Sequence, residues 1–366
     1  MQPSGDVVVT PLTLPREVGR YLRTLRAILG GQPFWVPPLA FERRRFFDPA
    51  KNPWFDEGEA QLFHVPRRGT ISAHTHRTTP GVGYFGFFDF VDDPAVSSAL
   101  FDAARQWLRA RGCTSMVGPF SFGNQHAYGM LVDGFDQLPA VGNTWNPPYY
   151  EAHYRALDLE LHEEWYAYGV ERGAVPERLA RISERLLTRH PEIRIESLDL
   201  AQEDRYHRIF LDIYNAAFHD LAGHTDLTLR EYSFIVEDFR PLLDPDLVLF
   251  AFVDDEPAAA SITLPDVAPA LLRMDGGLLP FGWMHWLRRD RYVDRIRVFG
   301  LGVDPRFQRL PLGAPLYVET WKRAFAKGIR RADASQIAAT NGRMRGAVEK
   351  VGMTITQTWR TYQRAP

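Results

Sequence analysis

The sequence has little of several features that would point directly to a function. Cys113 is the only cysteine among 366 residues, so no disulfide can form within the chain. The net charge is −2, which gives no bulk attraction to nucleic acid. The longest apolar run, residues 247–253, is far short of the roughly 18 residues of a membrane-spanning helix. Because no basic and apolar leader follows Met1, we expect a cytoplasmic protein without a transmembrane segment.

The composition that remains is typical of a globular protein. Hydrophobic residues make up 45% of the chain and charged residues 24%. Only four of the 43 cationic residues are lysines, namely Lys51, Lys322, Lys327 and Lys350, a bias that we attribute to genome composition. At about 150 residues per domain, the length predicts at least two hydrophobic cores.

The second half of the chain reads as an alternation of strands and helices. The predicted order is β, α, α, β, β, β, α, β, α, β, β. Thr228 is placed to cap a helix, and residues 254–256 are placed to form a hairpin turn. The predicted strands are 193–200, 247–254, 258–264, 296–303, 332–339 and the extended residues 353–363, and the predicted helices are 203–219, 228–243, 313–327 and one after Asn341.

The first half repeats this pattern. Asn146 precedes Trp165 by 19 residues, and Asn341 precedes Trp359 by 18. Residues 84–91 read as a strand that ends in Asp-Asp-Pro and leads into a helix, as Asp304-Pro305 does in the second half. We infer a duplication of one unit.

The duplication predicts how the chain is divided. Residues 1–170 form the first unit, residues 171–190 a linker helix and residues 191–366 the second unit. Each unit carries an insertion, residues 119–145 in the first and residues 267–294 in the second. Because insertions often lie beside functional sites, both are candidates for supplying functional groups.

Two motifs of the second half resemble the GCN5-related N-acetyltransferase (GNAT) superfamily over residues 193–364. In that family a strand ends in Val-x-Pro, and a loop of the type Gln/Arg-x-x-Gly-x-Gly/Ala then opens a helix; Gln308, Pro311 and Gly313 stand at the three positions here. The second motif, an Asn that opens a helix ending in Gly, is matched from Asn341 to Gly352. The resemblance implies an α/β (α+β) fold of two GNAT-like mixed-sheet units with flanking helices, the first of them degenerate.

The whole chain also resembles a group of long bacterial N-acyltransferases. The shared strings are F-W-V-P-P, D-P-A-K-N-P, L-V-D-G-F-D and N-P-P-Y-Y. Some members of the group are linked to bacterial ceramide synthesis and acylate a long-chain amine. The resemblance implies acyl-CoA or acyl-ACP as co-substrate, a small-molecule or lipid amine as acceptor, an acyl carrier protein as a possible partner, and no metal.

The GNAT resemblance also implies where the thioester binds. Its pyrophosphate needs main-chain N–H donors, which the start of a helix supplies. Pro311 has no N–H, so one such contact is lost, and about 1.5 to 3 kcal/mol of binding energy with it. The oxyanion would be held by a strand N–H near residues 301–303. The implied cofactor-binding residues are Leu301, Gly302, Val303, Gln308, Arg309, Leu310, Leu312, Gly313, Ala314 and Asn341.

The catalytic groups are less clear because family members often place a tyrosine on the helix after the Asn. The equivalent place here is Val348, so the proton donor must come from elsewhere. The first insertion places His126 and Tyr128 in a glycine-flanked loop, and with Asn341 they are the candidate catalytic residues. The alternative for His126 is a surface histidine that makes ordinary hydrogen bonds.

Two other patterns do not indicate a metal site or a catalytic nucleophile. His74 and His76 would point to one face of a strand, but no third metal ligand is indicated. Ser121 misses the Gly-x-Ser-x-Gly spacing of a hydrolase nucleophile by one residue. We therefore predict direct attack of the amine on the thioester, with neither a metal nor a covalent enzyme intermediate.

The second insertion is unusually apolar for a connection. It contains Leu271, Leu278, Phe281, Trp283 and Trp286, and arginines follow it at positions 288, 289, 291, 295 and 297. One interpretation is a plug between the two units. The other is a hydrophobic lid or channel for a long acyl chain that contacts a membrane surface.

Two further functions remain open at this stage. Pro311 and Val348 would suit a degenerate, two-lobed binding protein of the same fold. A tRNA-dependent aminoacyl transferase is the other alternative, but the net charge of −2 argues against an RNA partner.

Overall fold

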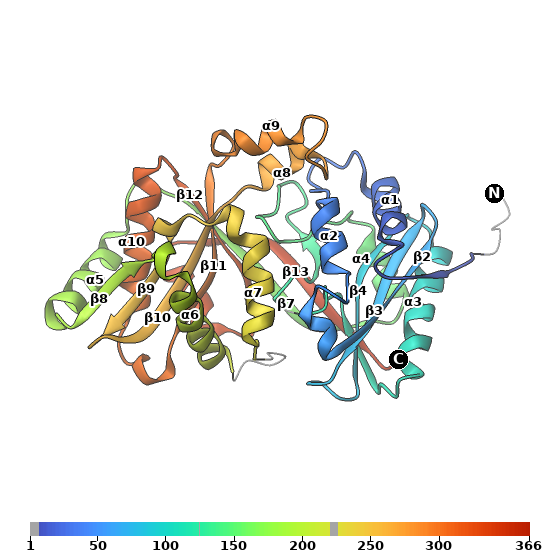
Figure 1. Ribbon diagram of the computed structural model, residues 1–366, viewed down its shortest axis with the longest axis horizontal. Helices are drawn as coiled ribbons and strands as arrows, with labels where there is room; N and C mark the ends of the chain where they lie inside the picture. Colours follow the sequence, from blue (N-terminus) through green and yellow to red (C-terminus); the bar gives the residue numbers. More distant parts are fainter. Residues whose placement is uncertain (1–6, 124, 220–225) are drawn as a thin grey trace.

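The structure, a computed structural model, describes residues 7–123, 125–219 and 226–366. In this part of the chain all the strands belong to one continuous 13-stranded sheet, with helices packed against it (Figure 1). The strand order is β1-β2-β3-β4-β5-β13-β7-β12-β11-β10-β9-β8, and β6 pairs with β13 off this path. The strands are β1 (Thr10–Leu12), β2 (Gly58–Val65), β3 (Gly69–His76), β4 (Val82–Phe90), β5 (Ser115–Gly118), β6 (Met130–Asp133), β7 (Glu160–Glu171), β8 (Ile193–Ser197), β9 (Val248–Val253), β10 (Glu256–Pro265), β11 (Arg295–Val303), β12 (Arg331–Ala338) and β13 (Thr354–Arg364).

The α-helices of the described residues cover both faces of this sheet. In β9 every residue is buried, because Phe250 packs into the core under α6 whereas Leu249 and Ala251 face the core under α10. The helices are α1 (Val18–Leu29), α2 (Ala40–Phe46), α3 (Pro94–Arg109), α4 (Tyr150–Ala156), α5 (Glu177–Arg189), α6 (Glu203–Phe218), α7 (Leu229–Phe239), α8 (Ala268–Met274), α9 (Gly282–Leu287), α10 (Gly313–Ala326) and α11 (Gly342–Lys350).

Local sequence signals fix several of these elements. Thr228 caps α7 through a capping box with Glu231, and Asp93 caps α3 with Pro94 in the first turn. Asp254 and Asp255 both have positive φ and close the β9–β10 hairpin. Each of these three features confirms a prediction from the sequence.

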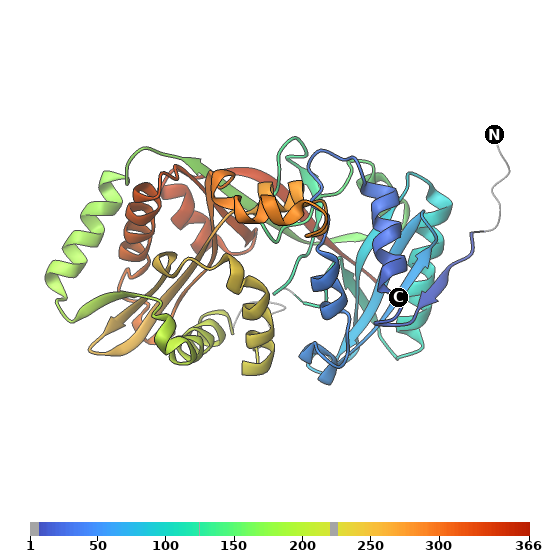
Figure 2. The same cartoon turned by 45° about the horizontal axis from the view of Figure 1, so that its top comes forward.

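The two halves of the chain have the same arrangement. β4, α3 and β5 of the first half correspond to β11, α10 and β12 of the second, and each strand pair is parallel. The predicted α/β fold with two mixed-sheet units is therefore confirmed. The insertion of the second half forms α8 and α9, which lie across the top of both lobes (Figure 2).

The halves exchange their last strands. β7, from the first half, pairs with β12 of the second half, and β13, from the second half, pairs with β5 of the first half. β7 and β13 also pair with each other at the centre of the molecule, where Trp165 lies opposite Trp359. Tyr168 lies opposite Ile355 and Leu161 opposite Tyr362, so the pairing is nearly symmetric about the two tryptophans. Each half therefore completes the sheet of the other. The division of the chain into units 1–170 and 191–366, joined by a linker helix at residues 171–190, stays a prediction.

Candidate active site

The main opening in the sheet lies where β11 and β12 separate. Their parallel pairing ends at Val298 and Ala334, and beyond this point the two strands diverge. β11 also has a bulge against β10: Ile262 pairs with Gly300 and Thr263 with Val298, which leaves Phe299 as the extra residue. A bulge re-aims the main-chain groups of its strand, so this part of β11 can present amides to a ligand.

A cavity of about 830 Å³ extends from this opening. Its lining is mostly apolar and comes from both halves of the chain. A cavity of this size is at the upper end of the range for small-molecule sites. The apolar lining includes Phe41, Phe46, Trp165, Phe210, Tyr232, Phe239, Leu301, Tyr317, Ile337 and Met344.

The insertion of the first half places Tyr128 and His126 in the wall of this cavity. The ring of Tyr128 contacts Trp165 edge-on at 4.7 Å, and its carbonyl accepts a hydrogen bond from Gln336 of β12 at 3.3 Å. Burial raises the pKa of the Tyr128 hydroxyl above its usual range, although the charge of Arg297 opposes this effect. Tyr128 is therefore protonated at neutral pH and can donate a hydrogen bond or a proton.

His126 lies beside Phe46, with the two ring centroids 4.9 Å apart. Burial lowers the pKa of His126 to about 4, and the charge of Arg43 acts in the same direction. The imidazole is therefore neutral at pH 7, but a group with this pKa is a weak base. Both residues line the cavity, and their catalytic roles stay predictions.

A buried polar network lies at the base of the opening. The guanidinium of Arg297 donates to the carbonyl oxygens of Ser335 and Val141, and the Ser335 hydroxyl donates to Asp333. Asn143 donates to the Ser335 hydroxyl oxygen at 2.8 Å. Burial raises the pKa of Asp333 and lowers that of Arg297, while their mutual attraction opposes both shifts. Through Val141 and Asn143 this network joins the first insertion to the site.

A second buried pair supports the same region. Arg295 contacts Asp266 at 2.5 Å, and the Asp266 side chain is 1% exposed. The other carboxylate oxygen of Asp266 accepts hydrogen bonds from the amides of Val141 and Ala268, at 2.9 and 3.1 Å. Asp266 therefore ties β11, α8 and the first insertion together.

The predicted thioester loop lies at the start of α10, outside the lining of the cavity. The amides of Leu310, Leu312 and Ala314 donate to main-chain carbonyls within the loop, at 2.9, 2.8 and 3.0 Å. Among the described residues, the amides of Arg309 and Gly313 have no such acceptor. Gly313 begins α10, and Arg309 is exposed beside it. A phosphate could engage these two amides without first breaking a main-chain hydrogen bond.

The other predicted residues fall into two groups. Leu301 lines the cavity, whereas Gly302 and Val303, next along β11, do not. The exposed Gln308 accepts a hydrogen bond from Arg343 at 2.9 Å, which links the loop to α11. The role of each as a cofactor-binding residue stays a prediction.

Asn341 lies in the wall of the cavity, and its side-chain oxygen accepts a hydrogen bond from the amide of Met344 at 3.1 Å. Its oxygen therefore caps α11. Val348, at the place where relatives often carry a tyrosine, is fully buried against Tyr168 and Met353. The structure thus places no hydroxyl at that point of α11.

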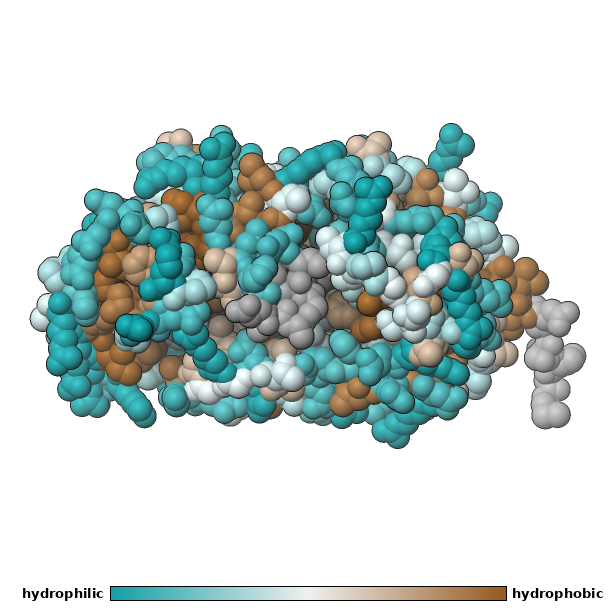
Figure 3. Space-filling view, turned by 90° about the horizontal axis from the view of Figure 1, so that it is seen from below, coloured by the Kyte–Doolittle hydropathy of each residue, from teal (hydrophilic) through white to brown (hydrophobic). Residues whose placement is uncertain are grey.

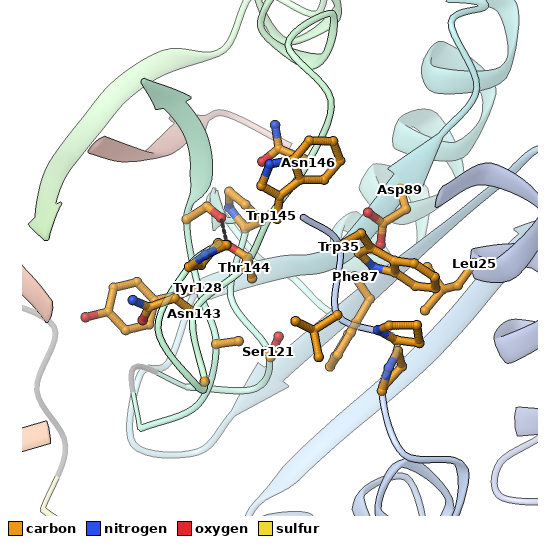
Figure 4. Close-up of a pocket in the computed structure, with 18 of the residues that line it drawn as sticks. Leu25, Trp35, Phe87, Asp89, Ser121, Tyr128, Asn143, Thr144, Trp145 and Asn146 are labelled. Atoms are coloured by element: carbon orange, nitrogen blue, oxygen red, sulfur yellow. Dashed lines mark hydrogen bonds between the residues drawn. The ribbon is translucent and has the colours of Figure 1, made fainter. Parts of the chain in front are cut away.

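A second, smaller cavity of about 270 Å³ lies in the first half and shares part of its wall with the large one. Leu25, Trp35, Phe87 and Asp89 line one side of it, and Ser121, Tyr128 and residues 143–146 line the other (Figure 4). Burial raises the pKa of Asp89 to about 6, although a hydrogen bond from Tyr150 at 3.2 Å opposes this effect.

Glu42 and Arg43, on α2, line both cavities. Burial and the charge of Asp238 raise the pKa of Glu42 to about 7, against the effect of Arg43 and Arg45. Sequence reasoning missed both residues, because they begin the charged string Glu-Arg-Arg-Arg, which is typical of a solvated helix face.

The corresponding opening in the first half is filled by the chain itself. β4 and β5 are paired over residues 82–84 and 115–117, and beyond them the amide of Phe120 donates to the carbonyl of Phe85 at 2.8 Å. A side chain at Gly86 would meet the Phe120 carbonyl oxygen at 1.8 Å. This contact explains the glycine and leaves no space between the first-half strands for a thioester.

The other sequence candidates lie in the first half. Ser121 lines both cavities. Trp54 contacts His74 edge-on and His76 at a tilt, with ring centroids 5.8 and 5.6 Å apart, and burial lowers the pKa of His74 to about 3. Within the described ranges no group of three or more metal-ligating side chains occurs.

These features define a GNAT fold built from two units that exchange strands. A tandem GNAT protein from the clavulanic acid biosynthesis pathway matches 98% of both chains with a TM-score of 0.59 at 11% identity. A GCN5-related N-acetyltransferase from Sphaerobacter thermophilus matches 98% of this chain and 95% of its own with a TM-score of 0.53 at 10% identity. No family model matches the sequence.

The sequence itself identifies a narrower group. A bacterial ceramide synthase from Caulobacter vibrioides is 33% identical over 99% of this chain and 98% of its own length. The chain belongs to the family of that protein.

Proposed function

We propose that this protein transfers an acyl group from acyl-CoA to the amine of a long-chain or lipid acceptor. The observation that carries the proposal is the apolar cavity of about 830 Å³ that opens where β11 and β12 diverge. The GNAT fold and the ceramide synthase relative support this reaction class. Acyl-ACP is an alternative donor that the same opening would admit.

The reaction would proceed by direct attack of the amine on the thioester carbonyl. Main-chain amides near the Phe299 bulge would hold the developing oxyanion, and the amides of Arg309 and Gly313 would hold the pyrophosphate. The Tyr128 hydroxyl would donate a proton to the departing thiolate. Cys113 packs against the core of the first half, and burial raises the pKa of its thiol, so it is not an activated nucleophile.

One observation favours the alternative of a binding protein without activity. Three amides of the predicted pyrophosphate loop donate inside the loop, and Pro311 has none to donate. Such a protein would bind a long-chain ligand in the cavity but release no thiol from acyl-CoA.

Turnover of a thioester tests the proposal and separates it from that alternative. Purified protein with palmitoyl-CoA and an 18-carbon primary amine is expected to release CoA and form the amide. Ala338→Trp, in the cavity wall, is expected to lower this rate at least tenfold because the indole fills the acyl space. Ala326→Trp, at the exposed end of α10, is the matched control and should leave the rate unchanged. Saturable palmitoyl-CoA binding without any CoA release would instead identify a binding protein.

We also propose that α8 and α9 touch a membrane from which the lipid amine is taken. Leu271, Met274 and Trp286 of this segment line the cavity, whereas Leu279 and Leu287 are 84% and 67% exposed. The opposite face of the molecule is mostly hydrophilic (Figure 3). The arginines at positions 288, 289 and 291 flank the apolar residues and would contact anionic headgroups. No helix in the described part of the chain is long and apolar enough to cross a membrane.

Vesicle binding is expected to depend on this segment. Replacing Leu279, Phe281 and Leu287 together by glutamine should weaken cosedimentation with phosphatidylglycerol vesicles at least 100-fold, because burying each side chain is worth about 1.5 to 3 kcal/mol. The matched control replaces Leu161, Leu200 and Ile355, which are 52%, 55% and 44% exposed elsewhere. Equal losses in the two triple variants would refute a membrane-facing role for α8 and α9.

A further inference from the structure

The wall between the two cavities contains an unusual pair of charged neighbours. Glu42 and Arg43 are consecutive residues of α2, and each lines both cavities. Ser121, Tyr128 and Asn143 of the first insertion also line both. This wall therefore joins the apolar cavity, which opens at the β11–β12 separation, to the smaller cavity around Asp89.

Among the described residues, neither the Glu42 carboxylate nor the Arg43 guanidinium has an ion-pair partner. The Glu42 side chain makes no hydrogen bond in this part of the chain, whereas its neighbour across the interface, Asp238 on α7, is ion-paired with Arg45. Partly buried carboxylates are normally paired, so an unpaired one in a cavity wall calls for a ligand. The groups that act on Glu42 are Asp238 from α7, and Arg43 and Arg45 from its own helix.

Arg43 is held by rings and not by carboxylates. Its guanidinium carbon lies 5.5, 5.9 and 5.3 Å from the ring centroids of Phe46, Phe47 and Phe87. Its positive charge acts to lower the pKa of both Asp89 and His126. For Asp89 the effect of burial, which raises the pKa, is larger. The aromatic rings fix the guanidinium between the two cavities and leave its N–H groups available to a bound molecule.

We propose that the smaller cavity holds the polar end of the amine acceptor and that Glu42 accepts the proton that the ammonium loses before attack. Arg43 orients the acceptor by donating to an electronegative atom near its nitrogen. This inference rests on the proposed acyl transfer and adds to it the residue and the pocket that serve the acceptor.

The protons and bonds balance. The ammonium gives one proton to the Glu42 carboxylate, and the neutral amine attacks the thioester carbonyl carbon. The C–N bond forms and the C–S bond breaks. The Tyr128 hydroxyl gives its proton to the departing thiolate and takes up the second proton of the nitrogen in its place. Glu42 then releases its proton to solvent. One proton per turnover is therefore released when the acceptor begins as an ammonium.

The surroundings of Glu42 also give its carboxyl group a pKa that suits a base. Burial, with Asp238 adding to it, raises the pKa of Glu42 to about 7. A carboxyl with that pKa is a stronger base than an ordinary glutamate and is still ionised in half of the molecules at neutral pH. Glu42 is better matched to proton acceptance than His126, which also lines the large cavity and has a pKa of about 4.

Glu42→Gln tests the assignment in the full chain with palmitoyl-CoA and an 18-carbon primary amine. We expect kcat to fall at least 100-fold while the Kd for palmitoyl-CoA, measured by calorimetry, stays within twofold. The wild-type rate should rise with pH through a midpoint near 7, and this step should be absent from the residual activity of the variant. The amine itself ionises near pH 10, so its titration is distinct.

Glu237→Gln is the matched control, because the charge of Arg45 acts on both glutamates, but Glu237 is ion-paired with Arg45 and 68% exposed. It should keep the wild-type rate and pH profile. If Glu42→Gln is not obtained folded, Glu42→Asp is expected to lose at least tenfold in kcat, because its carboxylate is one methylene shorter. Near-wild-type kcat in either Glu42 variant, or a retained step near pH 7, overturns the assignment of Glu42. A wild-type protein that releases no CoA would instead overturn the proposed function itself.

Discussion

Neither half of the chain is expected to fold when residues 1–175 or 176–366 are expressed alone. The first fragment would contain β7 without β12 and β13, the two strands between which it lies. The second would contain β13 without β5 and β7. Each fragment would thus expose both edges of one isolated strand and one edge of its remaining sheet, and the second fragment would also expose the otherwise fully buried Trp359.

Coexpression should restore the fold. The two fragments are expected to copurify as a 1:1 complex whose circular dichroism and thermal unfolding resemble those of the intact protein. Size-exclusion chromatography and near-ultraviolet circular dichroism give the measurement, because a fixed tryptophan environment has a near-ultraviolet signal. A monomeric fragment with a cooperative unfolding transition would show that the strand exchange is dispensable.

Replacing Asp266 by alanine is expected to cost about 3 to 5 kcal/mol in the free energy of unfolding. The change leaves Arg295, whose side chain is 12% exposed, without its carboxylate, and it leaves the amides of Val141 and Ala268 without their acceptor. An uncompensated buried charge is far more costly than the loss of a surface pair. Urea unfolding followed by tryptophan fluorescence measures the effect.

The matched control is Asp294→Ala. Asp294 pairs with Arg331 at 2.7 Å, but its side chain is 59% exposed. Solvent screens such a pair, so the loss should stay below about 1 kcal/mol. Similar losses in the two variants would contradict the distinction between buried and exposed pairs on which the expectation rests.

The elements of the second half could be predicted closely because their signals are local. The helix predicted at residues 313–327 is α10, Gly313–Ala326, and the strand predicted at residues 296–303 is β11, Arg295–Val303. Apolar spacing, helix caps and turn residues determine such elements within a few neighbours in the sequence. The repeat of the pattern in the first half also pointed to the tandem arrangement.

The order of the strands could not be predicted in the same way. An extended pattern at residues 353–363 indicates a strand but does not say which strand lies beside it. β13 pairs with β5 and β7 of the first half, about 185 to 250 residues away in the sequence. The relevant information lies in the fit of side chains such as Trp359, whose Cβ packs on Gly129 and whose indole donates to the carbonyl of Thr144 at 3.0 Å.

The site shows the same division between local and distant information. A glycine-flanked loop marked His126 and Tyr128 as unusual, and both line the large cavity. No sequence signal singled out Glu42 and Arg43, because a run of charged residues on a helix normally faces water. Here α2 lies against the cavities, and tertiary packing alone turns that helix face inward.

The exchanged strands also affect how the protein is made. About 180 residues separate β7 from β13, and at about 5 to 20 residues per second the ribosome needs roughly 10 to 40 s to synthesise them. During that interval β13 has not been synthesised, so the edges of β5 and β7 that pair with it in the folded protein are exposed. Synthesis therefore passes through a stage in which unpaired strand edges are open to aggregation, and slow translation of residues 172–353 would prolong it.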